Sequence, residues 1–179
     1  QWNNGLVPSI IFHNLEDNTY FPGPDIWKLE ENADHLTKKF NCTGIIQPPI
    51  HADACLHLYK KSNNIEFLKK IYPKLLKWHK YLYNERDIND EGLIYIRHPW
   101  ESGMDNSPIW DTALNRIQID EFKYSKYRTD DKKVNSLERP DDITYERYLK
   151  LIDLFKECKF NEKLIFKKSE YIIQDVLFN

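Results

Sequence analysis

The segment from His98 to Asp111 concentrates the residue types that could carry out chemistry. Its fourteen residues read HPWESGMDNSPIWD and include three acids and two tryptophans, Glu101, Asp105, Asp111, Trp100 and Trp110. Sugar rings stack their apolar C–H faces on tryptophan, and cleavage of a glycosidic bond needs a carboxylic acid beside the leaving oxygen. The segment therefore fits a carbohydrate site. It also fits a loop whose acids cap helices and whose tryptophans fill a core, which is the commoner use of such residues.

Other motifs that could carry chemistry are weak in this sequence. His51 and His57 are six residues apart, which places them about 240° around a helix rather than on one face, a poor arrangement for metal ligands. His79 falls on an apolar stripe and is expected to pack there. The five glycines form neither a phosphate-binding loop nor a Gly-x-Ser-x-Gly nucleophile elbow. We therefore predict no metal site and no cofactor.

Composition and charge narrow the classes of partner. Lys and Arg total 26 against 28 Asp and Glu in 179 residues, and the formal charge of -2 argues against a nucleic-acid partner or a basic membrane anchor. The cysteines, Cys42, Cys55 and Cys158, are odd in number and form no C-x-x-C pair. They argue against a disulfide framework and favour a reducing compartment. We expect a cytoplasmic protein, because no targeting segment or membrane-spanning stretch is visible.

Helical periodicity predicts the elements that precede the acid-rich segment. Asp25 is placed to cap a helix that runs to about residue 40, and Pro48-Pro49 then open another helix. Residues 64–86 carry apolar side chains at spacings of three and four, which is typical of one helix face. Pro73 is expected to kink that helix or divide it in two.

Helices are also predicted after the acid-rich segment. Residues 93–96 are too short for more than a small strand, and residues 120–138 are charged and weakly periodic, which indicates an exposed excursion. The helical period returns at 145–155, and Ser169 is placed to cap a last helix that continues to Phe178. Helices joined by loops of uneven length favour an all-α assembly with functional loops at one end.

Residues 100–108, WESGMDNSP, resemble the acid-bearing segment of the mannosylglycerate and glucosylglycerate hydrolases of glycoside hydrolase family 63. They are also similar to the Glu-Ser-Gly-x-Asp segment of trehalases. Further segments agree with the family in the same order: WxNGxVP at 2–8, YFPGPD at 20–25, QPPxHA at 47–52, Arg139-Pro140 with Tyr145, and QDxLF at 174–178. One tripeptide is weak evidence, whereas several segments in family order are specific. The resemblance covers nearly the whole chain.

The resemblance implies a fold and a set of roles. The fold is all-α, part of an (α/α)6 barrel of twelve helices with the site at its mouth, and residues 1–179 form one partial catalytic domain with about half of the helices. Asp105 takes the position of the general acid in an inverting hydrolase of a small α-glycoside such as mannosylglycerate or glucosylglycerate. The implied substrate-binding residues are Trp100, Tyr20, Gln47 and Gly103 at the sugar, Arg139 and Tyr145 at the glycerate, and Asn4 by analogy with the trehalase branch.

The length departs from the family pattern. Twelve helices of roughly 12 residues with their loops need well over about 250 residues, so the chain is expected to be a fragment. The family's general base is a glutamate far beyond Asp105, and some sugar contacts precede Gln1, so the remainder of the barrel is an expected partner besides the carbohydrate substrate. Ile109 stands where relatives commonly carry arginine, so no charge is expected there.

Two points stay open at this stage. Asp105 has to keep its proton until it donates it, which requires partial burial or a neighbouring carboxylate, and Glu101 is the neighbour that the sequence offers. The alternatives to a glyceryl-glycoside hydrolase are a trehalase-like or α-glucosidase-like hydrolase of a neutral sugar, and a non-catalytic sugar-binding half-barrel. Residues 1–179 alone are expected to be inactive, because the base is absent from them.

Overall fold

The computed structural model describes residues 1–13, 20–33, 35–36, 41–128, 135 and 139–179. Seven α-helices stand in this part of the chain: α1 (Pro24–Trp27), α2 (Leu29–Asn32), α3 (His51–Ser62), α4 (Ile65–Arg86), α5 (Asp111–Leu114), α6 (Asp142–Glu157) and α7 (Glu162–Lys168). Strand pairing in the described residues is limited to two isolated bridges, Ile11 with Cys42 and Ile96 with Ile173. The all-α prediction is confirmed.

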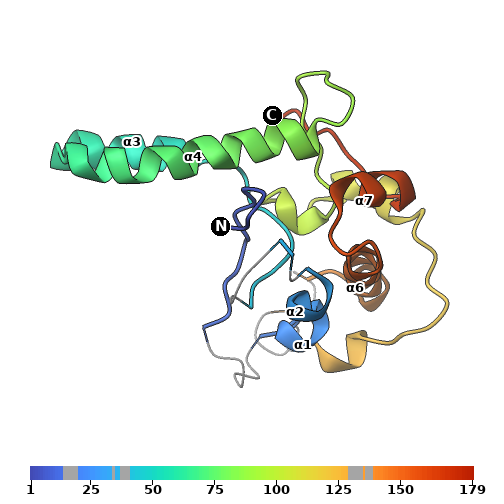
Figure 1. The fold of residues 1–179 in the computed structure, drawn as a ribbon. Coiled ribbons are helices and arrows are strands. Elements are labelled where there is room, and N and C mark those ends of the chain that lie inside the picture. Colours follow the sequence, from blue (N-terminus) through green and yellow to red (C-terminus); the bar gives the residue numbers. More distant parts are fainter. Residues whose placement is uncertain (14–19, 34, 37–40, 129–134, 136–138) are drawn as a thin grey trace.

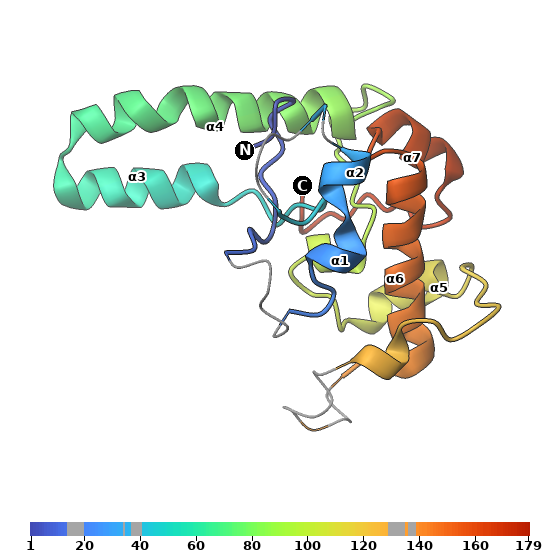
Figure 2. The same cartoon turned by 60° about the horizontal axis from the view of Figure 1, so that its bottom comes forward.

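Helices α3 and α4 form a hairpin that projects from the rest of the molecule (Figure 1) and whose two helices run antiparallel (Figure 2). Asn64 caps α4 by accepting a hydrogen bond from the Phe67 amide at 3.0 Å. No residue of α3 is buried, and the buried residues of α4 begin only at Trp78. We call α3 and the part of α4 before Trp78 the arm. The apolar stripe predicted for residues 64–86 therefore packs into the body only near its C-terminal end.

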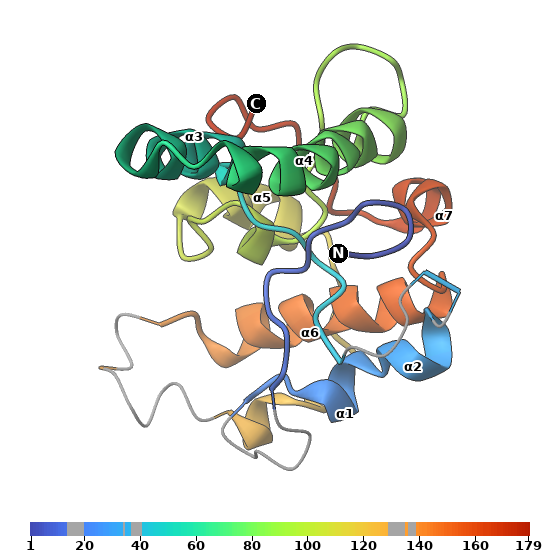
Figure 3. The same ribbon diagram turned by 60° about the vertical axis from the view of Figure 1, so that its left-hand side comes forward.

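Helix α6 is the centre of the body. Its N-cap, Asp141, accepts a hydrogen bond from the Thr144 amide at 2.8 Å, and the helical period then turns one face inward. The buried residues of α6 are Tyr145, Glu146, Tyr148, Leu149, Leu151, Ile152 and Phe155. Full burial of one such large apolar side chain contributes about 1.5–3 kcal/mol, so α6 is strongly anchored. Helices α2 and α7 both pack against it (Figure 3).

Two extended segments in the N-terminal part of the chain pair with each other. Residues 9–12 and 41–45 lie side by side, because Ser9, Thr43 and Phe12 donate backbone hydrogen bonds to Ile45, Ile10 and Asn41 at 2.9 Å each. The side chains of Ser9 and Thr43 add a hydroxyl contact of 2.6 Å. This pairing fixes the path of the chain just before Gln47 and Pro48, which reach the site.

The prediction of one helix that Asp25 caps is wrong. The chain forms two short helices, α1 and α2, because Lys28 between them adopts a left-handed conformation with φ of 47°. Asp25 lies in the first turn of α1 and does not cap it, since Gly23 is the N-cap residue. Residue 34 and residues 37–40 of that prediction lie outside the described part of the chain.

Two further expectations are corrected, and a third holds for most of its described residues. Pro73 does not divide α4, because it lies on an exposed stretch where water can satisfy the carbonyl freed by the missing N–H. Ser169 ends α7 instead of starting a helix: its hydroxyl accepts a hydrogen bond from the Tyr171 amide at 3.1 Å, and Asn161 is the residue that caps α7. The described residues after residue 120 are mostly exposed, as predicted, although Tyr124 and Arg128 are buried; residues 129–134 and 136–138 of that prediction lie outside the described part of the chain.

None of the helices in the described residues combines the length and apolar character needed to cross a bilayer.

Candidate active site

Residues 97–111, which we call the acid loop, are shaped by local signals. Pro99 and Pro108 each begin a one-turn 3-10 helix, because proline is pre-set for a first helical turn. Gly103 has a φ of +73°, and a Cβ at this position would stand 3.2 Å from Cγ of Pro48. The glycine therefore allows both the tight turn and the close approach of the Gln47-Pro48 segment.

The acid loop and the start of α6 enclose a pocket of about 330 Å³. Its lining brings together two residues that are far apart in the sequence, Asp105 and Arg139. The other lining residues are Asn106, Ser107, Asp111, Pro140, Thr144 and Tyr148. A carboxylic acid, a guanidinium and a phenol thus share one small space, which is wide enough for a small polar group.

Arg139 enters this pocket with unused hydrogen-bonding capacity. Its Nε atom is buried and has no hydrogen-bond partner among the described residues. A buried donor without a partner costs about 1–3 kcal/mol, so such a group is readily explained by a ligand that satisfies it. Arg139 and Asp105 therefore give the pocket one donor fork and one acid.

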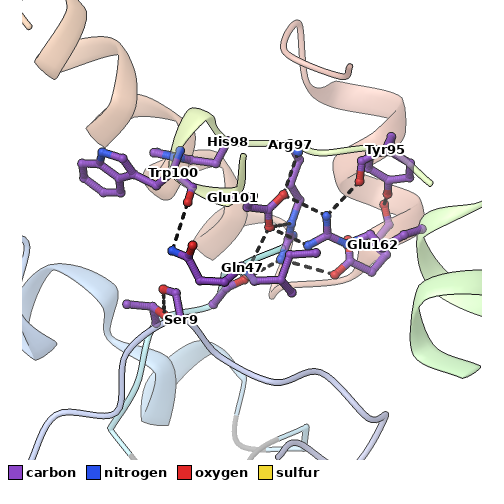
Figure 4. A network of polar contacts seen from close by, with 12 residues as sticks. Ser9, Gln47, Tyr95, Arg97, His98, Trp100, Glu101 and Glu162 are labelled. Carbon is purple, nitrogen blue, oxygen red and sulfur yellow. Dashed lines mark hydrogen bonds and ion pairs between the residues drawn. The ribbon is translucent and has the colours of Figure 1, made fainter. Parts of the chain in front are cut away.

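An aromatic cluster stands beside the pocket. The Trp100 ring meets Tyr145 at 6.1 Å and Tyr148 at 5.4 Å between ring centroids, in both cases edge to face. Gln47 Nε2 donates to the main-chain carbonyl of Trp100 at 3.2 Å, as Figure 4 shows. Three predicted site residues, Trp100, Gln47 and Tyr145, are thus brought together by the fold. Tyr145 is held in turn by Phe21, whose ring stacks on it at 6.0 Å and whose carbonyl accepts its hydroxyl at 3.4 Å.

Two predicted site residues have a different environment in the structure. Tyr20 packs edge to face on Phe12 with a centroid distance of 5.2 Å, and it is 36% exposed. Asn4 accepts a hydrogen bond from the Leu6 amide at 3.2 Å, which is a local turn contact. No described hydrogen bond joins Asn4 or Tyr20 to the pocket residues, so their roles stay predictions.

Glu101 does not act as the neighbour that holds a proton on Asp105, and this expectation is corrected. Its side chain is 0% exposed and is bound on both oxygens by Arg86, at 2.7 and 2.9 Å. Burial alone would raise the pKa of Glu101, but the charge and hydrogen bonds of Arg86, with help from Arg97, lower it below its usual value. Glu101 is therefore a structural residue whose ionised form is stabilised by the two arginines.

Glu101 belongs to a buried ion cluster formed by Arg86, Arg97, Glu101 and Glu162. Figure 4 labels its members Arg97, Glu101 and Glu162. Arg86 also pairs with Glu162 of α7 at 3.0 Å. Arg97 pairs with Glu162 at 3.3 Å and donates to the Gly44 carbonyl at 2.6 Å. Two positive and two negative charges compensate one another there, which is the condition for tolerating charges away from water.

The ion cluster positions the site residues through main-chain bonds. The amides of Ile46 and Arg97 donate to Glu101 at 3.2 and 2.9 Å. Ile46 directly precedes Gln47, and Arg97 begins the acid loop. One buried carboxylate therefore ties together the two chain segments that carry Gln47 and Trp100.

Sequence reasoning did not single out His98 and Tyr148. The Tyr148 hydroxyl donates to the main-chain carbonyl of Asp105 at 2.8 Å, and the His98 ring bonds both to the Tyr148 carbonyl and to the Trp100 amide, each at 3.1 Å. Tyr148 falls on the predicted apolar period of this helix, and its place one turn after Tyr145 is the signal that could have marked it as a site residue. His98 offered no such signal, because its burial arises from long-range packing.

Burial keeps both of these groups neutral. Burial, followed by the nearby charges of Asp105, Asp111 and Asp141, raises the pKa of Tyr148, so its hydroxyl remains a donor. Burial lowers the pKa of His98 to about 4, even though its bond to the Tyr148 carbonyl favours the protonated form. A neutral His98 satisfies both contacts when Nε2 carries the proton and Nδ1 accepts.

The fold and the site together define a class: a helical domain that presents a carboxylic acid and aromatic rings around a small pocket, as glycoside hydrolases with helical barrels do. Residues 1–178 match the mannosylglycerate hydrolase MGH1-like glycoside hydrolase domain. The chain therefore belongs to this family, and its helices form part of an (α/α)6 barrel.

Individual relatives agree with this assignment. The chain is 42% identical to the mannosylglycerate hydrolase of Rubrobacter radiotolerans, over 100% of this chain and 41% of the relative. It is 34% identical to the glucosylglycerate hydrolase of Mycolicibacterium hassiacum, over 100% of this chain and 42% of that protein.

Solved structures extend the similarity to three dimensions. The crystal structure of the GH63 mannosylglycerate hydrolase of Thermus thermophilus with Tris and D-glycerate is similar with a TM-score of 0.85 and 38% identity, over 99% of this chain and 41% of that one. The chain thus spans about two fifths of the length of the relatives it matches.

Proposed function

We propose that the whole protein containing this chain is an inverting glycoside hydrolase that cleaves mannosylglycerate or glucosylglycerate, with Asp105 as general acid. The observation that carries the proposal is the shared pocket of Asp105 and Arg139. Mannosylglycerate and glucosylglycerate hydrolases among the relatives, and D-glycerate bound in the similar crystal structure, support the choice of substrate.

The chemistry needs one carboxylic acid here and one carboxylate elsewhere. Asp105 donates its proton to the glycosidic oxygen as the bond to the sugar breaks, while a second carboxylate removes a proton from the attacking water. In inverting enzymes the two groups stand roughly 6.5–9.5 Å apart. We propose that the second carboxylate belongs to the part of the barrel that these residues do not include.

Arg139 recognises the glycerate in this proposal. A planar guanidinium can bind a carboxylate through two parallel charge-assisted hydrogen bonds, which are stronger than neutral ones. The buried Nε of Arg139, without a partner among the described residues, supports that role. Tyr145 is the second predicted glycerate contact, Trp100 is the aromatic residue at the sugar, and the remaining substrate-binding predictions are Tyr20, Gln47, Gly103 and Asn4.

The role of Asp105 is tested by a pair of matched variants of the whole protein. Asp105→Asn should lower kcat by at least about 10²-fold, because the amide has no acidic proton to donate. Asp111→Asn makes the same chemical change in the same pocket and should keep kcat within about tenfold of wild type. The reverse order of losses would assign the acid to Asp111.

The stereochemistry of the product is an independent test. Proton NMR of the first-formed sugar should show the β anomer released from an α-glycoside, because a single displacement inverts the anomeric carbon. First-formed α sugar would mean retention and would overturn the mechanism.

The substrate is tested at Arg139. Arg139→Ala should cost about 2–4 kcal/mol in kcat/KM for the glyceryl glycoside, because a charge-assisted contact to the aglycone is lost. A neutral glycoside of the same sugar should be little affected. Equal losses on both substrates would make Arg139 structural, and no loss on either would favour a hydrolase of a neutral sugar.

The exposed side chains of the α3–α4 hairpin support the barrel remainder as a partner. Large apolar residues of the hairpin are unusually exposed: Leu56 at 45%, Leu58 at 56%, Tyr72 at 64%, Leu76 at 41% and Tyr83 at 61%. Many large apolar side chains left exposed on one element indicate an interaction surface. We propose that the rest of the barrel covers it. Purified residues 1–179 should accordingly show no glycosidase activity, and detectable turnover free of contaminants would contradict this.

A further inference from the structure

Asp105 is held in place through its main chain by one side chain of α6. Tyr148 donates its hydroxyl to the Asp105 carbonyl at 2.8 Å, and in the described residues this is the hydrogen bond that reaches Asp105. Tyr148 itself is only 1% exposed, so its ring has little freedom to move. The position of the acid thus depends on a contact between the acid loop and α6.

A second contact links the same residue to the start of the acid loop. The Tyr148 carbonyl accepts from His98 Nε2, and His98 Nδ1 accepts from the Trp100 amide, each at 3.1 Å. The His98 ring also lies 4.5 Å from the Trp100 ring and 5.5 Å from that of Tyr148. Tyr148 therefore joins α6 to the loop on both sides of the 3-10 turn that Pro99 begins, at His98 and at Asp105.

We propose that Tyr148, with His98, is a positioning residue that holds the Asp105 main chain, and with it the acid, in register with the substrate-binding residues of α6. The proposal rests on the proposed function, in which Asp105 is the general acid. Tyr145 lies one turn before Tyr148 on α6, so the same helix carries the predicted glycerate contact and the anchor of the acid. Acid and aglycone site then move as one unit.

Small displacements of a general acid are costly. Proton donation needs the acid within about 2.6–3.2 Å of the leaving oxygen, and a misplacement of about 1 Å can cost about 10²-fold in rate. Removing one hydroxyl from Tyr148 leaves the ring packing intact and frees the Asp105 carbonyl. The expected consequence is a loss of kcat with little change in KM.

The test compares Tyr148→Phe with Tyr124→Phe in the whole protein. Tyr124 is the matched control, because it is also buried and its hydroxyl also bonds to α6, to the Asp153 carboxylate at 2.9 Å, outside the pocket. Each variant loses a single oxygen atom. A merely structural role predicts similar losses of thermal stability and no effect specific to proton donation.

Two substrates separate proton donation from general damage. On the glyceryl glycoside, Tyr148→Phe should lower kcat about 10- to 100-fold with KM within about threefold, and Tyr124→Phe should be near wild type. On the glycosyl fluoride of the same sugar, whose fluoride departs without a proton from the acid, Tyr148→Phe should lose less than about threefold. Asp105→Asn calibrates the scale by showing how far the fluoride bypasses the acid. Equal losses on both substrates, or no loss on either, would overturn the proposal.

Amide hydrogen exchange gives a readout that does not need activity. The amides of Met104 and Ser107 are hydrogen-bonded to Ser102 Oγ and the Met104 carbonyl, both at 2.9 Å, and flank Asp105. Their exchange should accelerate in Tyr148→Phe and stay unchanged in Tyr124→Phe. If the wild-type protein hydrolyses no glycoside, the proposed function fails on its own, and unchanged exchange in Tyr148→Phe is then the result that overturns the positioning role.

Discussion

Two carboxylates of the acid loop, four residues apart, have opposite surroundings. Glu101 lies at the back of the loop, fully buried, with both oxygens taken by Arg86 and by main-chain amides. Asp105 lies at the front and lines the pocket, and its carboxylate accepts no hydrogen bond from the described residues. A carboxylate surrounded by donors stays ionised, whereas one without donors is left open to a ligand. The comparison shows that packing, rather than residue type, decides which acid is paired in the interior and which one is left open to the pocket.

The largest expected effect on stability is at Glu101, the buried acid of the loop. Glu101→Gln in the whole protein should lower the free energy of unfolding by about 3–5 kcal/mol, because Arg86 and Arg97 then share one buried carboxylate, Glu162, and one buried positive charge is left uncompensated. Asp105→Asn is the matched change at the front and should stay within about 0.5 kcal/mol of wild type. Urea unfolding followed by tryptophan fluorescence measures both. Similar losses of unfolding free energy at the two positions would mean that Glu101 and Asp105 do not differ in their contribution to stability.

The next effect concerns how stability depends on pH through His98. Burial holds the pKa of folded His98 at about 4, whereas an unfolded histidine titrates near 6.5. The unfolded chain binds the extra proton between these values, so this stabilisation is complete above about pH 6.5 and is lost as the pH falls toward about 4. The difference corresponds to about 3 kcal/mol.

His98→Gln isolates the contribution of the histidine. The variant should flatten the slope of unfolding free energy against pH between about pH 4 and 6.5, while carboxylates elsewhere keep their own contribution. Unfolding free energies at four or five pH values measure the slope. Parallel pH profiles for wild type and variant would show that His98 is not held neutral by the fold.

A smaller effect is expected at Gly103, where the front of the loop meets Pro48. Gly103→Ala should cost about 1–2 kcal/mol for the left-handed backbone, with an added cost from the Cβ at 3.2 Å from Pro48 Cγ. Gly92→Ala is the control, because Gly92 has a similar φ of +76° and nothing within 4 Å of an added Cβ. Equal thermal shifts in the two variants would mean that the contact with Pro48 does not hold the loop.

The smallest effect in the chain itself is expected on the arm. Tyr72, 64% exposed, should tolerate Tyr72→Ser within about 0.5 kcal/mol in residues 1–179, because little packing is lost. In the whole protein the same change should cost at least about 1 kcal/mol, since the proposed remainder of the barrel buries the ring. Thermal unfolding of both forms measures the difference. Equal small effects in both forms would mean that the rest of the barrel does not bury Tyr72.

Much of the fold could be predicted from local patterns. The periodicity at residues 64–86 and 145–155 matches α4 and α6, and the family segments correctly indicated part of an (α/α)6 barrel. The prediction that Ser169 caps a helix was wrong, because a serine side chain can equally hydrogen-bond to its own neighbours in a turn. The prediction of one helix from Asp25 onward was wrong for a related reason, because periodicity does not reveal a left-handed residue such as Lys28.

The sequence by itself determined the residues of the acid loop, its prolines and its glycine turn, and the family to which the chain belongs, because these depend on near neighbours along the chain. Only the tertiary structure decided which acid is buried, since Glu101 meets Arg86 of α4 and lies in one cluster with Glu162 of α7. It also decided that Asp105, Arg139 and Tyr148 share one pocket. Burial and charge pairing depend on contacts between distant segments, and spacing along the chain does not encode them.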